Sequence, residues 1–259
     1  MMRVDMAGRV VFITGAAGGI GSAMAAAFAA NNAAIAVVDI AADAARAVAA
    51  TLPDALGIEM DVRDTPSIEA AVAATLKRWG RIDVLINNAG VNTLHHRVHI
   101  DEFPPEEWHR IVSVDLDGLF LTSRIVLKPM LARGEGRVIN IASVAGLVPL
   151  RLQSPFVAAK AAVVNLTKSM ALELGPRGIL TNCIAPGSTL TDGTRQLFYG
   201  ADGKFSAKVA DLMRHVPLGR PAEVAEIAAA ALYLADPECS YVNGHVLAVD
   251  GGWTAGYMM

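Results

Sequence analysis

Residues 14–21, TGAAGGIG, lie between a short apolar run at 10–14 and an Ala-rich run that has the pattern of a helix. Glycines in such a turn let the backbone approach a pyrophosphate closely, and the following helix N-terminus supplies amide groups and a partial positive charge. The turn alone is weak support. It gains weight because strand, turn, helix and second strand follow one another in the required order. The stretch therefore predicts a dinucleotide site at the first strand end.

Outward from this turn, short Val- and Ile-rich runs alternate with longer Ala/Leu patterns through the whole chain. We expect strands at 10–14, 34–39, 56–61, 84–87, 137–141, 180–184 and 245–249, and helices near 19–31, 41–51, 66–79, 105–131, 155–174 and 221–234. Strands that are apolar nearly throughout and separated by helices indicate a parallel sheet covered on both faces. The predicted fold is a doubly wound α/β domain with about seven parallel strands flanked by helices.

The chain shows no linker-like or low-complexity stretch, so we expect one domain over residues 1–259. The segment 188–220 differs from the rest because glycines, prolines, aromatic residues and charges are mixed in it. It follows a predicted strand end, where open α/β sheets bind ligands. A substrate lid is predicted there, and an ordinary surface excursion is the alternative.

Charge and cysteine content narrow the class of partner. The net charge is −3 from 22 basic and 25 acidic residues that are interspersed, which argues against nucleic acid or an anionic membrane and favours a small soluble ligand. Cys183 and Cys239 are too few for a disulfide framework or a thiolate metal site, and both are expected in the core. No secretory signal or membrane span is expected, so the predicted location is the cytoplasm.

Asp39 ends the second predicted strand, where a carboxylate can accept hydrogen bonds from the adenosine ribose hydroxyls and repel a 2′-phosphate. Residues 40–45 contain no Arg or Lys, and Arg46 lies more than a turn into the next helix. The pattern predicts NAD in preference to NADP, with a helix N-cap as the alternative role for Asp39. Asp61-Val62 ends the third predicted strand and is expected at the adenine, with a role in helix capping equally open.

Taken together, these residues resemble the short-chain dehydrogenase/reductase family, in its branch of single Rossmann-type domains of about 250 residues. The motifs that carry the resemblance are TGAAGGIG at 14–21, Asn87-Asn88-Ala89-Gly90, Ser143, Lys160 and PGSTLT at 186–191. The resemblance implies an NAD-dependent oxidoreductase. The expected cofactor contacts are Gly15, Ala17, Gly18, Gly19, Ile20, Gly21, Asp39, Asp61, Val62, Asn88, Ala89, Gly90, Lys160, Pro186, Gly187, Thr189 and Thr191.

The resemblance also implies a catalytic serine, tyrosine and lysine, usually joined by an asparagine from the central helix. Ser143 and Lys160 match, whereas the tyrosine position holds Phe156 and the asparagine position holds Asp115. A tyrosinate would take the substrate's hydroxyl proton, with Lys160 favouring its ionisation and Ser143 holding the substrate oxygen. Phenylalanine keeps the ring and removes the proton-transfer atom. Asp115 could accept the asparagine's hydrogen bonds if it is ionised beside Lys160.

Two histories are open for position 156. Because the other parts of the site remain, the pattern favours a deliberate Tyr→Phe change, of the kind used to trap a bound substrate, over a natural replacement. Two functional classes are open as well. The first is an NAD-dependent dehydrogenase of a small hydroxylated substrate, inactivated at Phe156. The second is a catalytically silent nucleotide-binding or interaction protein of the same fold.

Arg151 and Gln153 lie in the loop between Ser143 and the catalytic helix, where they are expected to contact the substrate together with Ser143 and Phe156. An arginine there could bind a carboxylate, which suits a sugar acid, keto-deoxy sugar acid or hydroxy acid alongside polyols. A solvated loop charge is the alternative for Arg151. The histidines at 95, 96 and 99 lack partners at ligand spacing, so no metal is expected, and His95 or Arg97 is assigned to the substrate rim.

The C-terminal run from Asp250 to Met259 is short and apolar, with glycines as hinges. In the family such tails commonly pack between subunits, so the resemblance implies a homotetramer in which Trp253, Tyr257 and Met258 are covered. A tail folded onto its own subunit is the alternative.

Overall fold

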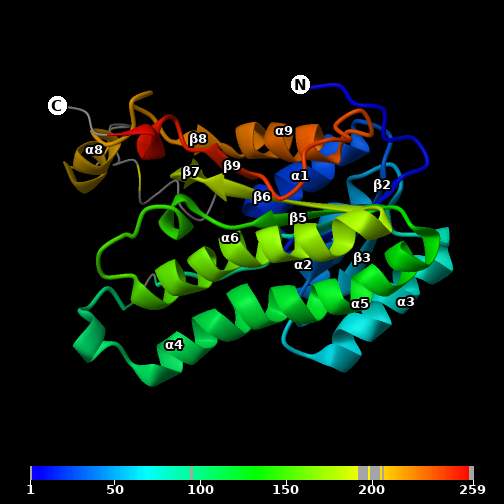
Figure 1. The fold of residues 1–259 in the computed structure, drawn as a ribbon, viewed down its shortest axis with the longest axis horizontal. Coiled ribbons are helices and arrows are strands. Elements are labelled where there is room, and N and C mark those ends of the chain that lie inside the picture. The colour runs from blue at the N-terminus through cyan, green and yellow to red at the C-terminus, as the bar shows by residue number, and fades with distance from the viewer. Residues whose placement is uncertain (1, 94–95, 192–197, 199–204, 206, 257–259) are drawn as a thin grey trace.

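A parallel sheet with a fixed strand order forms the centre of the computed structural model, which describes residues 2–93, 96–191, 198, 205 and 207–256 (Figure 1). Its seven strands run in the order β3-β2-β1-β4-β5-β6-β9, and every pairing is parallel. The strands are β1 Val10–Thr14, β2 Ala34–Asp39, β3 Ala55–Glu59, β4 Val84–Asn87, β5 Gly136–Ile141, β6 Ile179–Pro186 and β9 Val246–Val249. Strands β1 and β4 are buried at every residue, as expected for a sheet covered on both faces.

Helices cover the two faces of the sheet in separate layers. They are α1 Gly19–Ala29, α2 Ala42–Ala50, α3 Thr65–Trp79, α4 Pro105–Val112, α5 Gly118–Arg133, α6 Ser154–Leu174, α8 Ala207–Met213 and α9 Val224–Ala235. Figure 1 shows α1 and α9 together on one side and α5 and α6 on the other. One core cluster joins the sheet to α1, α2 and α9, and the second joins it to α3, α5 and α6. The doubly wound prediction is confirmed.

The strand order reverses between β1 and β4, which lie next to each other at the centre of the sheet. At such a switch point the connections leave to opposite faces and open a crevice at the carboxyl ends of the strands. The glycine turn follows β1, and the Asn88-Ala89-Gly90 segment follows β4. The fold therefore brings the two predicted cofactor motifs to one edge of the sheet.

The sequence-based prediction of one helix over 105–131 is wrong in one respect. A π-helical turn, Ser113–Asp117, separates α4 from α5. The turn carries Asp115 inward, where its Oδ1 accepts a hydrogen bond from the Val91 amide at 2.7 Å. This contact comes from a residue 24 positions away, so local periodicity does not report it. π-turns inside helices occur frequently at functional sites.

Some smaller features also differ from expectation. Helix α8 and the two-residue strands β7 Thr189–Leu190 and β8 Ala222–Glu223 were not predicted. Cys183 is buried as expected, whereas Cys239 lies half-buried in the loop after α9, and both are free thiols. Within the part of the chain that the structure describes, no helix has the length and apolar character needed to span a membrane.

Candidate active site

The glycine turn is held against β4 by a compact set of hydrogen bonds. Thr14 Oγ1 accepts from the amides of Asn88 and Ala89, each at 3.0 Å, and the Asn88 side chain donates to the Thr14 and Gly15 carbonyls, each at 2.9 Å. A Cβ on Gly21 would lie 2.2 Å from the Gly15 carbonyl oxygen. The turn therefore requires glycine at position 21 for its own packing.

Gly18 is different because no atom of the residues that the structure describes would lie within 4 Å of a Cβ placed on it. Its backbone is extended, at φ −171°, a conformation that any residue adopts. The residue lines the large cavity described below. Glycine at this position keeps space free on the cavity side and has no packing role within the chain.

Asp39 lies at the end of β2 and lines the same cavity. Its Oδ2 accepts from the Ala17 amide and its Oδ1 from the Ala41 amide, each at 3.0 Å. The carboxylate thus joins the glycine turn to the start of α2 while one edge faces the cavity. Arg46 lies on α2 and pairs with Asp43 at 2.7 Å, so its charge is balanced outside the cavity.

Asp61 and Val62 also line the cavity at this end, with Arg63 beside them. The Arg63 guanidinium donates to both Asp61 oxygens at 2.6–3.1 Å, and this hydrogen bonding lowers the pKa of Asp61. The N-cap of α3 is Asp64, whose side chain accepts from the Ser67 amide. Capping of this helix, the alternative role open for Asp61, belongs to Asp64.

One continuous cavity of about 1360 Å³ joins this end to the predicted reacting residues. Its volume exceeds the range of roughly 300–1000 Å³ that is usual for a single small ligand, so a dinucleotide and a substrate have room together. The predicted residues that line it are Gly15, Gly18, Ile20, Asp39, Asp61, Val62, Asn88, Ala89, Gly90, Ser143, Arg151, Gln153, Phe156, Pro186, Gly187, Thr189 and Thr191. Glycine 18, the Asp39 carboxylate and the cavity shape fit a nicotinamide dinucleotide.

At the other end, Ser143 and Phe156 face the cavity from two elements packed tightly together. Ser143 is the N-cap of a short 3-10 turn, Val144–Gly146, and its hydroxyl accepts from the Ala145 amide at 3.1 Å. A Cβ on Gly146 would lie 2.6 Å from the Lys160 carbonyl oxygen. This close approach fixes Ser143 relative to α6 and therefore to the ring of Phe156.

Lys160 lies one turn after Phe156 on α6, and its Nζ is 5.6 Å from the centre of the ring. The same Nζ is 2.9 Å from Asp115 Oδ2 and donates to the Ile141 carbonyl at 3.2 Å. Both side chains of the pair are buried. Neither residue is among those that line the cavity.

The loop before α6 shapes the predicted substrate end. Leu152 has φ +63°, a left-handed conformation that is costly for leucine and marks a strained turn between Arg151 and Gln153. Gln153 is buried, and its Oε1 accepts from the Thr93 hydroxyl at 3.4 Å. Arg151 is exposed, with one guanidinium nitrogen 3.5 Å from His99 Nε2. Both residues line the cavity.

Several lining residues were missed from sequence, among them Arg63, Arg110, Phe198, Leu212, His215 and Trp253. Arg110 is held by two hydrogen bonds to Glu107, at 2.7 and 2.8 Å, and donates to the Asn92 carbonyl at 2.8 Å. An exposed Arg on an amphipathic helix gives no signal that it faces a cavity. Arg97, predicted at the rim, lines the cavity, and His95 lies outside the described residues.

Besides Lys160, the predicted cofactor contacts Ala17, Gly19 and Gly21 are not among the cavity-lining residues. They shape the turn instead: the Ala17 amide binds Asp39, and the Cβ position on Gly19 lies 3.2 Å from Thr191 Cγ2.

The C-terminal segment folds onto its own subunit at Trp253. This ring packs against the cluster of Leu190, Phe198, Val209, Met213 and Val216 and lines the cavity. Trp253 thus contacts its own subunit, and the homotetramer stays a prediction. Tyr257 and Met258 lie outside the described residues.

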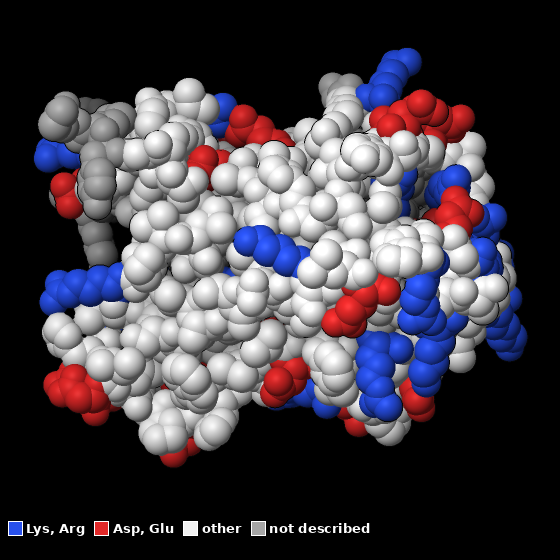
Figure 2. All heavy atoms as spheres, in the orientation of Figure 1, with Lys and Arg blue, Asp and Glu red and all other residues white. Residues whose placement is uncertain are grey.

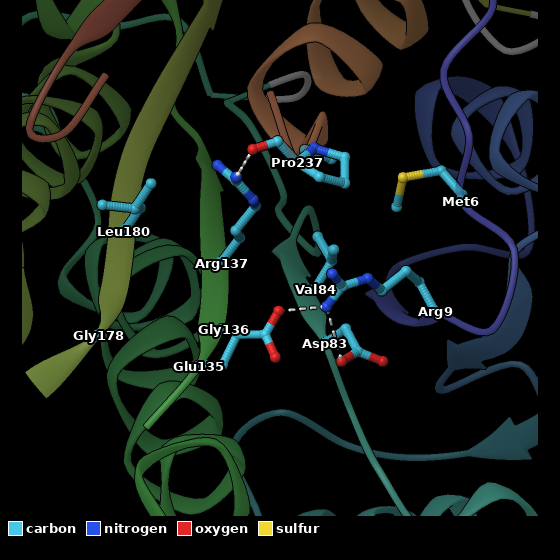
Figure 3. A pocket seen from close by; sticks show the side chains of 11 residues that line it. Met6, Arg9, Asp83, Val84, Glu135, Gly136, Arg137, Gly178, Leu180 and Pro237 are labelled. Carbon is cyan, nitrogen blue, oxygen red and sulfur yellow. Dashed lines mark hydrogen bonds and ion pairs between the residues drawn. The ribbon is translucent and has the colours of Figure 1, made fainter. Parts of the chain in front are cut away.

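A smaller cavity of about 180 Å³ lies at the opposite, amino ends of the strands (Figure 3). Figure 3 shows Arg9 turned toward Asp83 and Glu135, with which it forms ion pairs, and Arg137 turned toward the Pro237 carbonyl. Arg137 also donates to the Cys239 carbonyl at 2.8 Å, after the end of α9. The contacts of Arg137 join the sheet to the end of α9, and the ion pairs of Arg9 join the amino ends of the strands. These charged side chains therefore stabilise the fold.

Comparison with known proteins agrees with this geometry. The family model described as enoyl-(acyl carrier protein) reductase matches residues 15–254. The chain is a short-chain dehydrogenase/reductase. It is 38% identical to trans-4-hydroxycyclohexanecarboxylate dehydrogenase of Sinomonas cyclohexanicum, over 99% of this chain and 97% of that protein. It is 39% identical to D-threitol dehydrogenase of Mycolicibacterium smegmatis, over 95% and 93% of the two chains.

Among solved structures, levodione reductase superposes on this short-chain dehydrogenase/reductase with a TM-score of 0.90. The identity is 36%, over 97% of this chain and 100% of that one. Members of the family bind nicotinamide cofactors, and relatives of this chain are dehydrogenases of hydroxylated small molecules.

The contrast between two glycines gives a first prediction. Gly18→Leu is expected to weaken binding of a nicotinamide dinucleotide at least about tenfold, because its side chain enters the cavity without meeting protein. The unfolding temperature should barely change. Gly21→Ala should instead destabilise the fold by about 1–3 kcal/mol, because its methyl group meets the Gly15 carbonyl. Fluorescence titration and thermal unfolding distinguish the two, and a Gly18→Leu variant with unweakened binding would contradict the assignment.

Proposed function

We propose that this short-chain dehydrogenase/reductase is an NAD-dependent oxidoreductase of a small hydroxylated substrate, in which Phe156 withholds the proton-transfer group. The observation that carries the proposal is the single cavity that joins Asp39 and the glycine turn to Ser143 and Phe156. The test restores a hydroxyl at position 156 and follows NADH absorbance across a panel of sugar acids, keto-deoxy sugar acids, polyols and cyclic diols.

The cofactor would be held along the cavity by groups already described. The glycine turn and Ile20 would lie against the pyrophosphate, Asp39 against the adenosine ribose, and Asp61 and Val62 near the adenine. Asn88, Ala89, Gly90, Pro186, Gly187, Thr189 and Thr191 would line the nicotinamide half. When bound, the nicotinamide ring would accept or deliver hydride.

Around the reacting carbon, the chain supplies orientation. The Ser143 hydroxyl would hold the substrate oxygen, and the Phe156 ring would give that oxygen a neighbouring surface with no group that exchanges a proton. General acid/base catalysis contributes about 10²–10⁴-fold in rate. This form of the chain is therefore expected to bind cofactor and substrate and to turn over slowly. The alternative is a naturally silent nucleotide-binding protein, which restoration of the hydroxyl would leave inactive.

Charge at the adenosine end favours NAD over NADP. The groups facing the cavity there are the carboxylates of Asp39 and Asp61 and the guanidinium of Arg63, which Asp61 binds through both oxygens. The balance is negative, so a 2′-phosphate would be repelled. Because Arg63 is already paired, it offers the phosphate little compensation.

Asp39→Ala is expected to lower the ratio of the affinities for NADH and NADPH by about tenfold or more. The ribose hydroxyls of NADH lose their hydrogen-bond acceptor, and the 2′-phosphate of NADPH is no longer repelled by a carboxylate. Fluorescence titration with each dinucleotide measures the change. Asp43→Ala is the matched control, because Asp43 is an exposed carboxylate on α2 that pairs with Arg46 outside the cavity. Equal affinity of the parent chain for both dinucleotides would contradict the role of Asp39.

Among the described residues, Arg97, Arg110 and Arg151 line the cavity toward the substrate end, and a substrate with a carboxylate would suit them. One relative, named for a hydroxycyclohexanecarboxylate, acts on a molecule of this kind, and another is named for a neutral polyol. We assign acid recognition to Arg151 because it precedes α6 directly and lines the same cavity as Ser143. Gln153 would bind a substrate hydroxyl.

Arg151→Ala, made in the Phe156→Tyr background, is expected to raise KM for a carboxylate substrate by about 10–100-fold and to leave KM for a neutral polyol nearly unchanged. Steady-state kinetics on the two substrate types gives the comparison. Arg78→Ala serves as control, since Arg78 lies on α3 and pairs with Asp54. If KM stays unchanged for every carboxylate substrate, Arg151 does not bind the substrate and is a solvated charge of the loop.

We also propose a homotetramer in the cytoplasm, with residues 1–259 forming one domain and the described part of 188–220 covering the substrate end. Residues 192–197, 199–204 and 206 of this predicted lid lie outside the described residues. Phe198, Leu212 and His215, which line the cavity, support the cover. Figure 2 shows that the face over α5 and α6 carries few charged side chains. Phe120 of α5 and Leu172 of α6 are 52% and 80% exposed, which favours burial of these helices against another subunit.

A further inference from the structure

A buried ion pair lies directly behind the ring of Phe156. Lys160 Nζ is 2.9 Å from Asp115 Oδ2, and the two side chains are 7% and 0% exposed. The second oxygen of Asp115 accepts from the Val91 amide at 2.7 Å, and the lysine also donates to the Ile141 carbonyl at 3.2 Å. The main neutralising contact of each charge is therefore the other charge.

The protein closes this pair off from the cavity. A Cβ on Gly90 would lie 3.2 Å from Lys160 Nζ and 3.3 Å from Asp115 Oδ2, so the backbone after β4 covers one side. The Phe156 ring, 5.6 Å from the lysine nitrogen, lies toward the cavity and lines it. With little water present, each charge acts strongly on any ionisable group placed at position 156.

A buried ammonium requires a counter-charge. A hydroxylated ring at position 156 could supply one by ionising, whereas phenylalanine has no group that ionises. Asp115 supplies the negative charge instead. In the chain with Phe156, the charge of Lys160 is thus neutralised by Asp115 of the π-turn before α5, and the residue at position 156 of α6 contributes no charge.

The other ionisable groups facing this part of α6 do not replace Asp115. Glu107 and Arg110 of α4 bind each other, and the pKa of Arg110 is raised mainly by Glu107 and in smaller part by the charge of Asp115. On β6, burial raises the pKa of Cys183 to about 11, so its thiol is neutral at physiological pH. Arg151, before α6, is exposed.

We propose that Asp115 is a positioning residue that occupies the counter-charge place beside Lys160, so that the lysine no longer promotes ionisation of a hydroxylated ring at position 156. The inference rests on the proposed function, because that function assigns the proton transfer to this position. Its consequence is that Phe156→Tyr alone restores the proton-transfer atom but not the electrostatic setting that activates it. Full activation requires Asp115→Asn as well.

The expected direction follows from the signs of the charges. A phenol in water ionises near pH 10. A neighbouring ammonium favours the phenolate and lowers that value, and a carboxylate paired with the ammonium cancels the effect. Asparagine keeps an oxygen for the Val91 amide and removes the negative charge. The phenol introduced by Phe156→Tyr should therefore ionise about one to three pH units lower when Asp115→Asn is added.

The test is an absorbance titration of phenolate in Phe156→Tyr and in Phe156→Tyr/Asp115→Asn, each measured against the same chain with Phe156 and without cofactor. Asp117→Asn is the matched control, because Asp117 is an exposed carboxylate in the same π-turn and should leave the midpoint unchanged. Asp115→Ser is titrated alongside as a second variant that removes the charge, in case the asparagine variant does not fold.

Equal phenol midpoints with and without the Asp115 charge would overturn the inference. The pH profile of kcat separates this outcome from failure of the proposed function. A lowered phenol midpoint without turnover of any substrate would support the charge relation and contradict the oxidoreductase. Turnover whose pH midpoint does not move with Asp115 would support the oxidoreductase and overturn the role of Asp115.

Discussion

Phe156→Tyr is expected to raise the rate of NAD⁺ reduction by about 10²–10⁴-fold on at least one substrate of the panel near pH 10, where the phenol ionises without help from Lys160, and by less at pH 7 unless Asp115→Asn is added. The ring already occupies a place on α6 that faces the cavity, one turn before Lys160 and opposite Ser143. The substitution adds one oxygen and changes little of the ring's shape. Affinity for the dinucleotide should stay nearly constant, so the gain should appear in kcat.

Two control variants test whether the gain in rate depends on the position of the new hydroxyl and on Ser143. Phe103→Tyr adds a phenol at a residue outside the cavity lining and should leave the rate at the parent level. Ser143→Ala, added to Phe156→Tyr, should remove most of the gain, because the substrate oxygen then loses its hydrogen bond. A Phe156→Tyr chain that binds NADH normally and turns over no member of the panel even at pH 10, with or without Asp115→Asn, would favour the silent nucleotide-binding protein.

The sheet was predictable because its signal is local. Apolar runs at 10–14 and 34–39 match β1 and β2 residue for residue, since a strand buried on both faces has little freedom in composition. The adenosine end of the site was predictable for a related reason. The glycine turn and Asp39 follow strands directly, so their place along the chain fixes their place at the carboxyl edge of the sheet.

The remaining parts of the site depend on contacts between distant segments. The π-turn at 113–117 forms where Asp115 meets the Val91 amide and Lys160, and neither partner is visible in the local helical pattern. Arg110 faces the cavity because Glu107 and the Asn92 carbonyl orient its guanidinium. The family resemblance identified Asp115 as a departure and expected it beside Lys160. The fold adds the contact with the Val91 amide and shows that neither charged residue is among those that line the cavity.

Lys160→Met is expected to destabilise the chain by about 3–5 kcal/mol, because it leaves the Asp115 carboxylate buried without its cation. For a chain of this size the loss corresponds to a fall in unfolding temperature of roughly 6–20 °C. Lys160→Met/Asp115→Asn should recover most of it, since asparagine removes the charge and keeps an acceptor for the Val91 amide. Thermal and denaturant unfolding of the two variants and the parent complete the comparison.

Lys168→Met is the control on the same helix, where the lysine is exposed and the expected change is within about 0.5 kcal/mol. If Lys160→Met costs no more than Lys168→Met, the pair is solvated and the carboxylate needs no cation. A large loss in the single variant that the double variant does not recover would assign the cost to lysine packing. Recovery in the double variant would instead show that Lys160 stabilises the fold chiefly through Asp115, the relation on which the expected shift of the phenol depends.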